Sequence, residues 1–265
     1  MLKIGDKKLI NAWAFYDWAN SVYSLVISTA VFPLFYDAIT KDKTIIFLWM
    51  QWDYPDTLYS YALSFSFLVV AFMSPILSAI ADYTGNKLKF MKFFCWFGGL
   101  SVISMYFFED VNTAWIGIIC TIFASIGFWS SIVFYNSYLP EVAHPEQQDA
   151  ASAKGFIYGY IGSIILLGIS LYLIMSQENG DMKLQMMRYS FVMVGLWWIG
   201  FAQVTFKKLP NNVHHRKPEK DYIWKGFAAL KKVWIELKNY PTLRNFLIAF
   251  FLLSVGVQTI ILLAT

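Results

Sequence analysis

Stretches without a charged side chain recur along the sequence, and each is about as long as a membrane-spanning helix. No Asp, Glu, Lys or Arg occurs in seven runs: 18–36, 57–81, 93–108, 111–140, 155–177, 189–206 and 245–265. A helix needs about 20 mostly apolar residues, with a range of roughly 17 to 25, to cross a bilayer. The third run is short, but Lys92 can reach toward the interface and lengthen that span. The pattern therefore predicts an all-α integral membrane protein with seven transmembrane helices.

The composition agrees with this pattern and excludes several other classes of protein. Hydrophobic residues make up 58% of the 265 residues and charged residues 14%, against about 25% charged residues in ordinary soluble proteins. A soluble enzyme, a nucleic-acid-binding domain and a secreted disulfide scaffold are therefore excluded. Cys95 and Cys120 both fall inside predicted spans, where cysteine behaves as a small apolar residue.

The basic residues lie mostly on one side of the predicted spans. The N-terminus and segments 82–92, 141–154 and 207–244 hold 17 of the 21 Lys and Arg residues. Basic residues accumulate in cytoplasmic loops. The sequence therefore predicts a cytoplasmic N-terminus, and a multi-pass protein of the cell (inner) membrane.

Two connecting segments have a character of their own. The predicted outer loop 37–56 contains aromatic residues that suit a membrane interface, Trp49, Trp52 and Tyr54. The long inner loop 207–244 contains apolar residues at helical spacing, which are Ile223, Phe227, Leu230, Trp234 and Leu237. Two alternatives remain open for this amphipathic helix: it lies on the anionic inner leaflet, or it packs against the end of the bundle.

Polar residues follow one face of the first predicted span. At about 100° per residue the following side chains share an arc of roughly 100°: Asp17, Asn20, Ser21, Ser24 and Ser28. Polar groups inside a bilayer need a partner or a watery cavity. The stripe predicts a substrate cavity or a polar helix–helix seam. In the alternative, the serines bond to carbonyl groups of their own helix and Asp17 caps its N-terminus.

Further polar and small residues mark three other spans. Tyr135 and Asn136, near the inner end of the fourth span, could bind substrate or anchor at the interface. Gly155, Gly159 and Ser163 form a ladder of small residues that favours close helix packing. Gln258 lies in the otherwise apolar last span and needs a partner, so we expect it to face the bundle interior.

Catalytic and metal-binding motifs are absent from the sequence. The three histidines lie in predicted inner loops, and none is paired with cysteine at the spacing of metal ligands. The sequence contains no His-Glu-x-x-His, Gly-x-Ser-x-Gly or Walker motif. We therefore expect no catalytic residues, no metal site, no cofactor and no nucleic-acid partner.

The turn after the second predicted span resembles a signature of the major facilitator superfamily. That signature is Gly-x-x-x-Asp-x-x-Gly followed by two basic residues, and here it corresponds to Ser78, Asp82, Gly85, Asn86 and Lys87. Ser78 replaces the first glycine and Asn86 the first basic residue. The stretch lies on the inner side between the second and third spans, as that family requires.

Three further stretches resemble the vacuole-effluxer-like branch of this superfamily, whose yeast members are similar to autophagy-related amino-acid exporters. They are the segment from Trp13 to Ser21, the two segments 134–141 and 152–162 at the inner connection after the fourth span, and the segment from Gly256 to Ile261. Val255 stands where this branch usually has an acidic residue, so the last span lacks that group.

The resemblance implies a transporter of twelve helices in two six-helix lobes, with the solute bound between the lobes. The chain would then contain an N-terminal lobe (1–206), an inter-lobe loop (207–244) and the first helix of a second lobe (245–265). The residues that would line the cavity are Asp17, Asn20, Ser21 and Ser24 of the first span, with Tyr135, Asn136 and Gln258. Ser78, Asp82, Gly85 and Lys87 would form a cytoplasmic gate.

The resemblance also implies partners and leaves alternatives. The partners are the lipid bilayer, a small-molecule solute, with proton coupling left open, and the missing C-terminal lobe. The expected function is secondary active transport by alternating access, with amino-acid efflux as one activity. The alternatives are a membrane scaffold or receptor that does not transport, and an inactive half-transporter fragment.

Overall fold

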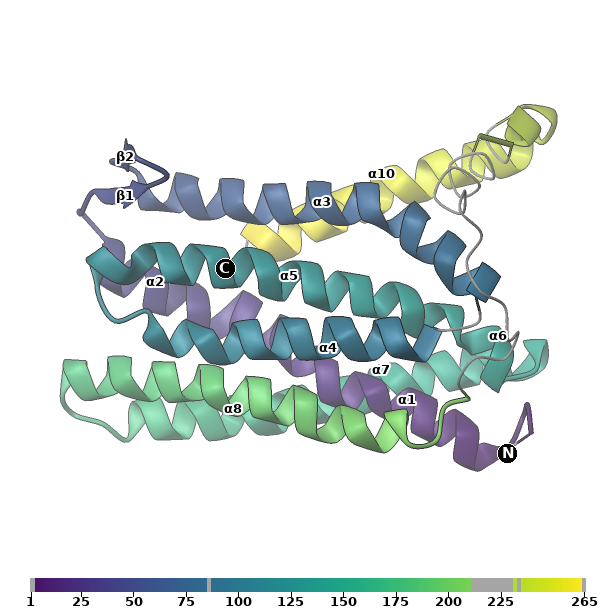
Figure 1. Ribbon diagram of the computed structural model, residues 1–265, viewed down its shortest axis with the longest axis horizontal. Helices are drawn as coiled ribbons and strands as arrows, with labels where there is room; N and C mark the ends of the chain where they lie inside the picture. The colour runs from purple at the N-terminus through teal and green to yellow at the C-terminus, as the bar shows by residue number, and fades with distance from the viewer. Residues whose placement is uncertain (1–2, 85–86, 211–230, 233–234, 264–265) are drawn as a thin grey trace.

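The structure, a computed structural model, describes residues 3–84, 87–210, 231–232 and 235–263, without the side chains of 79–84, 255 and 258–263. The long helices α3, α4, α5, α7 and α8 run alongside one another (Figure 1). In chain order the elements are α1 (Lys7–Val22), the π-helix η1 (Tyr23–Val31), α2 (Phe32–Thr40), β1 (Ile45–Phe47), β2 (Met50–Trp52), α3 (Pro55–Thr84), α4 (Lys87–Ser104), the 3-10 helices η2 (Met105–Phe107) and η3 (Val111–Thr113), α5 (Ala114–Ser137), α6 (Leu139–Val142), α7 (Pro145–Met175), α8 (Gly180–Phe206), the 3-10 helix η4 (Leu237–Asn239) and α10 (Pro241–Leu263).

Six helical segments in the described part of the chain are long and apolar enough to cross a membrane. They are Lys7–Thr40, Pro55–Ser78, Lys87–Phe107, Val111–Val142, Pro145–Met175 and Gly180–Phe206. Each contains one of the first six charge-free runs or most of it, so the prediction of an all-α, multi-pass membrane protein is confirmed. α10 covers the seventh run, and its described apolar part, Pro241–Ser254, is shorter than the six spans.

Several helices begin well before their charge-free runs, because their first turns are capped by polar residues. Asp6 caps α1 by accepting a hydrogen bond from the backbone N–H of Lys8 at 2.7 Å. α7 begins at Pro145, and His144 with Gln147 forms a capping box in front of it. The charge-free runs therefore locate the spans, but they place the first residues of these helices too late in the chain.

A short β-hairpin occupies part of the segment predicted as an outer loop. Its strands β1 and β2 pair antiparallel, with Phe47 opposite Met50. The two residues between them, Leu48 and Trp49, have φ angles of 51° and 61°. Such a turn usually contains Asn or Gly, so the sequence carried no signal for it. Trp49 is 96% exposed, and its position at a membrane interface remains a prediction.

The predicted tight turn at 109–110 is a short link between η2 and η3. Asp110 forms a capping box with Thr113, and the backbone N–H of Thr113 donates to its side chain at 3.0 Å. Hydrogen bonds from the side chain and backbone of Thr113 hold the pKa of Asp110 below its usual value.

The contacts between helices follow a repeated pattern. Each contact below has a counterpart when α1 is exchanged with α5, α3 with α7 and α4 with α8. α1 packs against α7, and the equivalent pair α5 and α3 also packs together. α4 packs against α5, and its counterpart α8 packs against α1. The exchange leaves the contact between α4 and α8 unchanged. This pattern matches the two nested three-helix repeats of a major facilitator lobe.

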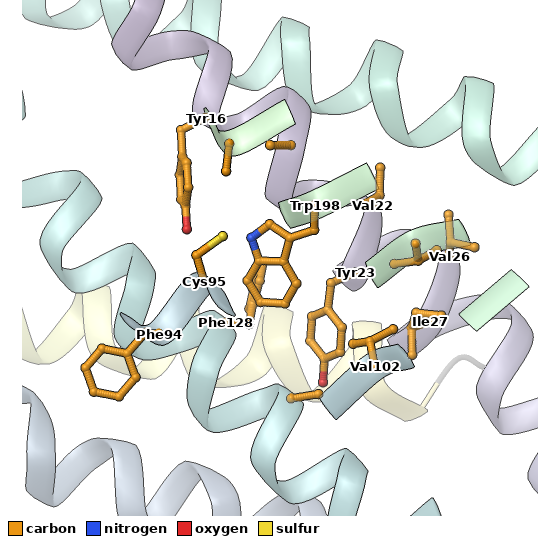
Figure 2. Close-up of a cluster of buried hydrophobic side chains, with 14 of the residues drawn as sticks. Tyr16, Val22, Tyr23, Val26, Ile27, Phe94, Cys95, Val102, Phe128 and Trp198 are labelled. Carbon is orange, nitrogen blue, oxygen red and sulfur yellow. The ribbon is translucent and has the colours of Figure 1, made fainter. Parts of the chain in front are cut away.

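Large buried side chains and close helix crossings hold the middle of the bundle together. Figure 2 shows Trp198 of α8 beside Tyr23 of η1 and Phe128 of α5, and the rings of Tyr23 and Trp198 lie 5.8 Å apart. α4 and α5 cross at Gly98 and Gly127, where a Cβ atom on Gly127 would lie 2.5 Å from Gly98 Cα. Only glycine fits a backbone approach of this kind.

Candidate functional site

Asp17 lies in α1, within the helical segment Lys7–Thr40 that is the first candidate span. Asp17 is the eleventh residue of α1, which begins at Lys7, so it lies about 15 Å along the helix axis. The alternative in which Asp17 caps the helix is wrong, because Asp6 holds that position. Asp17 is therefore a partly buried ionisable group among apolar spans.

Tyr135 of α5 is the hydrogen-bond partner of Asp17. Its hydroxyl group donates to Asp17 Oδ2 at 2.9 Å, across 118 residues of sequence. Trp13, one helical turn before Asp17, fixes Tyr135 in two ways. The two rings stack at 4.4 Å with an angle of 9°, and Trp13 Nε1 donates to the backbone oxygen of Tyr135 at 2.9 Å. Neither the contact of Trp13 with Tyr135 nor that of Asp17 with Tyr135 could be predicted, because nothing in the sequence reports contacts across helices.

The small residues of α7 face the polar side of α1. A Cβ atom on Gly155 would lie 2.5 Å from Asp17 Oδ2 and 2.8 Å from the hydroxyl oxygen of Tyr135. A Cβ atom on Gly159 would lie 2.6 Å from Ser21 Oγ. Ser163, farther along this face, is 2% exposed. The polar residues Asp17 and Ser21 thus lie in a seam between α1 and α7, closed by Tyr135 of α5.

The other residues expected at the cavity are not all brought to this seam. Asn20 is 1% exposed, and its side-chain nitrogen has no hydrogen-bond partner among the described residues. Ser24 and Asn136 are exposed. Asn136 follows Tyr135 directly in the chain, but the hydrogen bond to Asp17 comes from Tyr135.

A π-helix interrupts the periodicity on which the predicted stripe depended. Ser24 and Ser28 both lie in η1, where backbone hydrogen bonds join residues five apart. The hydroxyl group of Thr29 donates to the backbone oxygen of Ser24 at 2.9 Å. The shared arc predicted at 100° per residue therefore applies to Asp17, Asn20 and Ser21 of α1 but not to Ser24 and Ser28. π-Helical turns are often found at functional sites.

Of the residues expected to form a gate, Ser78 and Asp82 belong to α3 and Lys87 is the first residue of α4. Lys87 Nζ lies 2.8 Å from Glu141 Oε1 of α6 and donates to the backbone oxygen of Ser137 at 2.9 Å. Ser78 is in α3 and partly buried. Asp82 is also in α3, but its side chain lies outside the described residues, as does all of Gly85. The contact between Lys87 and Glu141 joins two motifs that were noted separately in the sequence.

Removing the carboxylate of Glu141 is expected to destabilise this end of the bundle. The side chains of Lys87 and Glu141 are 8% and 22% exposed. In Glu141→Gln the ammonium group of Lys87 loses a charged acceptor at a largely buried position, which costs about 1–3 kcal/mol. Thermal unfolding in detergent should show a lower midpoint. Glu146→Gln, at an exposed position of α7, is the control and should unfold like the wild type. Equal midpoints for Glu141→Gln and the control would contradict the prediction.

Two expected features lie wholly or partly outside the described residues. Gln258 belongs to α10, but its side chain is not described. Of the amphipathic segment 223–237, only the residues 231–232 and 235–237 are described. In the described part of the chain no group of three or more His, Cys, Asp or Glu side chains could hold a metal ion.

A family model described as "Vacuole effluxer Atg22 like" matches residues 5–265. The chain belongs to this family. It is 33% identical, over 96% of its own length, to the uncharacterized MFS-type transporter YxiO of Bacillus subtilis. It is 20% identical, again over 96% of its length, to autophagy-related protein 22 of Coccidioides immitis.

The matched region covers 59% of the Bacillus protein and 58% of the Coccidioides protein, so the chain spans about three-fifths of the length of these relatives. No solved structure matches the chain. The resemblance found in the sequence motifs is therefore confirmed at the level of the family, and the names of the family and of the Bacillus relative describe transport rather than catalysis.

Proposed function

We propose that this chain is the N-terminal lobe, with the first helix of a second lobe, of a secondary active transporter. The complete protein would move a small polar solute across the membrane by alternating access. Amino-acid efflux is the first activity to test. The observation that carries the proposal is the bond between Asp17 and Tyr135, two polar side chains held together between apolar spans.

The exposed sides of α3 and α7 support a second lobe. Large apolar side chains are exposed along both helices: Tyr61, Phe65, Leu68 and Phe72 on α3, and Phe156, Tyr160 and Ile164 on α7. Described side chains of α10 from Pro241 to Leu253 are exposed as well. Lipid can cover part of this surface. The remaining two-fifths of the relatives' length is enough for further helices that would pack on the rest.

The orientation follows from charge. The N-terminus and α6 lie at one end of the bundle, and the hairpin lies at the other (Figure 1). The segments assigned to the N-terminal side hold 17 of the 21 basic residues. By the positive-inside rule this end faces the cytoplasm, and Lys87 with Glu141 would form the inner gate.

The test is transport by the protein as its gene encodes it, reconstituted in liposomes. Uptake and efflux of a panel of labelled amino acids, short peptides and sugars should identify at least one solute that empty liposomes do not transport. Asp17→Asn should abolish that flux or uncouple it from an ion gradient. A correctly folded wild-type protein that moves none of the solutes, or unchanged coupled flux in Asp17→Asn, would overturn the proposal.

A further inference from the structure

Four lysines gather where α4 begins and α8 ends, at the end of the bundle that holds the N-terminus (Figure 1). They are Lys89 and Lys92 of α4, with Lys207 and Lys208, which directly follow α8. Lys92 is partly buried, and the other three are exposed. The Nζ atom of Lys92 lies 5.6 Å from the centre of the Phe206 ring, so its side chain reaches from α4 to α8.

The packing of α4 against α8 brings the four lysines to one level of the bundle. The two helices run antiparallel, and three contacts fix their register: Lys92 with Phe206, Gly99 with Ile199, and Ile103 with Gly195. Continued toward the start of α4, this register places Lys207 and Lys208 between the levels of Lys89 and Lys92. The four side chains therefore begin within about 5 Å of one another along the helix axes.

The end of α8 is fixed beside α4 by contacts on both sides of the peptide bonds at Lys207 and Lys208. The backbone N–H groups of both lysines donate to carbonyl groups in the last turns of α8. Leu209 is 5% exposed, and the hydroxyl group of Tyr138 donates to the backbone oxygen of Pro210 at 2.8 Å. The chain thus turns toward α5 after Lys208, and the two lysines stay at the outer side of the bundle.

Charges of one sign predominate at this place in both helices. α4 contains no acidic residue, and Asp181, the acidic residue of α8, lies at its other end. The first turn of a helix disfavours cations, so the helix dipole does not account for Lys89. Acidic residues of neighbouring elements near this end are Asp6, which caps α1, Glu141, which pairs with Lys87, Asp82 of α3, and Glu146 and Asp149 of α7. The surface between α4 and α8 is therefore suited to an anion.

Apolar surface continues from the lysines along both helices. Its exposed residues are Phe93, Trp96 and Leu100 on α4, and Val204, Gly200 and Leu196 on α8. Lys89 shares the face of Phe93 and Trp96, since these positions are four and three residues apart. Both helices are apolar enough to span a membrane. They are also not the helices α3 and α7, whose exposed sides were assigned above to a second lobe.

We propose that the four lysines bind the headgroup of one anionic phospholipid, whose acyl chains lie along the exposed apolar sides of α4 and α8. Lysine binds phosphate as a point charge, and basic clusters between spans on the cytoplasmic side accept anionic headgroups. Lys92, which reaches across to Phe206, positions one ammonium group between the two helices. The bound lipid would join α4 to α8 at this end. The inference goes beyond the proposed function, because it does not require that the protein transports a solute.

Native mass spectrometry of the complete protein in an uncharged detergent measures the binding of single lipids. Dioleoyl phosphatidylglycerol should bind as one saturable molecule, and more tightly than dioleoyl phosphatidylcholine, which has the same chains. Glycerol 3-phosphate, which has the phosphate but no chains, should not compete. A triple variant with Lys89→Gln, Lys207→Gln and Lys208→Gln should bind phosphatidylglycerol about a hundredfold more weakly and phosphatidylcholine unchanged.

The same end of the bundle provides a matched control. Lys3, Lys7 and Lys8 are exposed there, so a triple variant with Lys3→Gln, Lys7→Gln and Lys8→Gln removes the same number of charges. It should bind phosphatidylglycerol like the wild type. Size-exclusion profiles verify that both variants are folded. Equal losses in the two variants would show attraction by the overall charge, and equal binding of the two lipids by the wild type would show no selectivity for an anion. Either result overturns the site.

A photoreactive group on the acyl chain of phosphatidylglycerol tests the position of the lipid. In the complete protein the label should fall on α4 and α8, near Trp96 and Val204. Labelling confined to other helices overturns the placement, as does a surface of α4 and α8 that stays unlabelled because a second lobe covers it. Neither measurement involves solute flux, so a failure of the proposed function would leave this result unchanged.

Discussion

Replacement of Gly155 by leucine is expected to abolish transport by the complete protein without preventing its assembly. A side chain at this position would enter the space of Asp17 Oδ2 and of the Tyr135 hydroxyl group, which lie 2.5 Å and 2.8 Å from the Cβ position. These neighbours are side-chain atoms and can move aside, so α7 can still insert and pack. Their displacement breaks the bond between Asp17 and Tyr135. Misplacement of functional groups by about 1 Å can cost about a hundredfold in rate, and we expect a loss of that order in solute flux.

The same helix provides a matched control. Among the described residues, no atom of another element lies within 4 Å of the Cβ position of Gly168 in α7. Gly168→Leu adds the same side chain to the same helix at an open position, and flux should stay close to that of the wild type. Both variants should elute as single species in detergent. If Gly155→Leu transported as well as Gly168→Leu, the junction of Asp17, Tyr135 and Gly155 would have no role in transport.

Replacement of Gly127 by alanine is expected to weaken the bundle itself. A Cβ atom at this position would meet Gly98 Cα at 2.5 Å, Gly98 N at 2.6 Å and the backbone oxygen of Phe94 at 2.9 Å. All three are backbone atoms of α4, so relief requires the two helices to separate. Overpacking of this kind costs about 1–3 kcal/mol and sometimes more. The thermal unfolding midpoint in detergent should fall by several degrees, and leucine should prevent assembly.

Gly200 of α8 gives the opposite expectation for the same substitution. In the part of the chain that the structure describes, its Cβ position has no neighbour within 4 Å, so alanine creates no overlap there. Alanine is also favoured over glycine in a helix interior by about 1 kcal/mol. Gly200→Ala should therefore unfold at the wild-type temperature or above it. Equal effects of alanine at positions 127 and 200 would show that the crossing of α4 and α5 is looser than the structure indicates.

The fold class could be predicted because the bilayer imposes a simple requirement. Spans need long apolar runs, and the first six such runs each correspond to a spanning segment of the structure. Helix ends were less predictable: α7 begins at Pro145 within a polar segment, because its capping box lies there. The hairpin and the π-helix could not be predicted from the sequence. Neither Leu48-Trp49 nor the segment Tyr23–Val31 differs in composition from the residues around it.

The candidate site was predictable as a set of residues but not as an arrangement. The sequence singled out Asp17 and Tyr135 separately, as polar groups within apolar spans, and Gly155 as part of a ladder of small residues. It did not show that these three residues meet, or that Trp13 holds Tyr135 in place. Likewise Lys87 and Glu141 belonged to two different motifs before the structure joined them at 2.8 Å.

The sequence by itself therefore determined that this is a multi-pass membrane protein, where its first six apolar helices lie, and to which family it is similar. These features follow from local composition and short motifs, because hydrocarbon excludes unpaired charge wherever it occurs in the chain. The tertiary structure decided which helices touch and which face of α1 meets α5 and α7. Such contacts join residues more than one hundred positions apart, and they depend on how glycines and large side chains fit together when the helices pack.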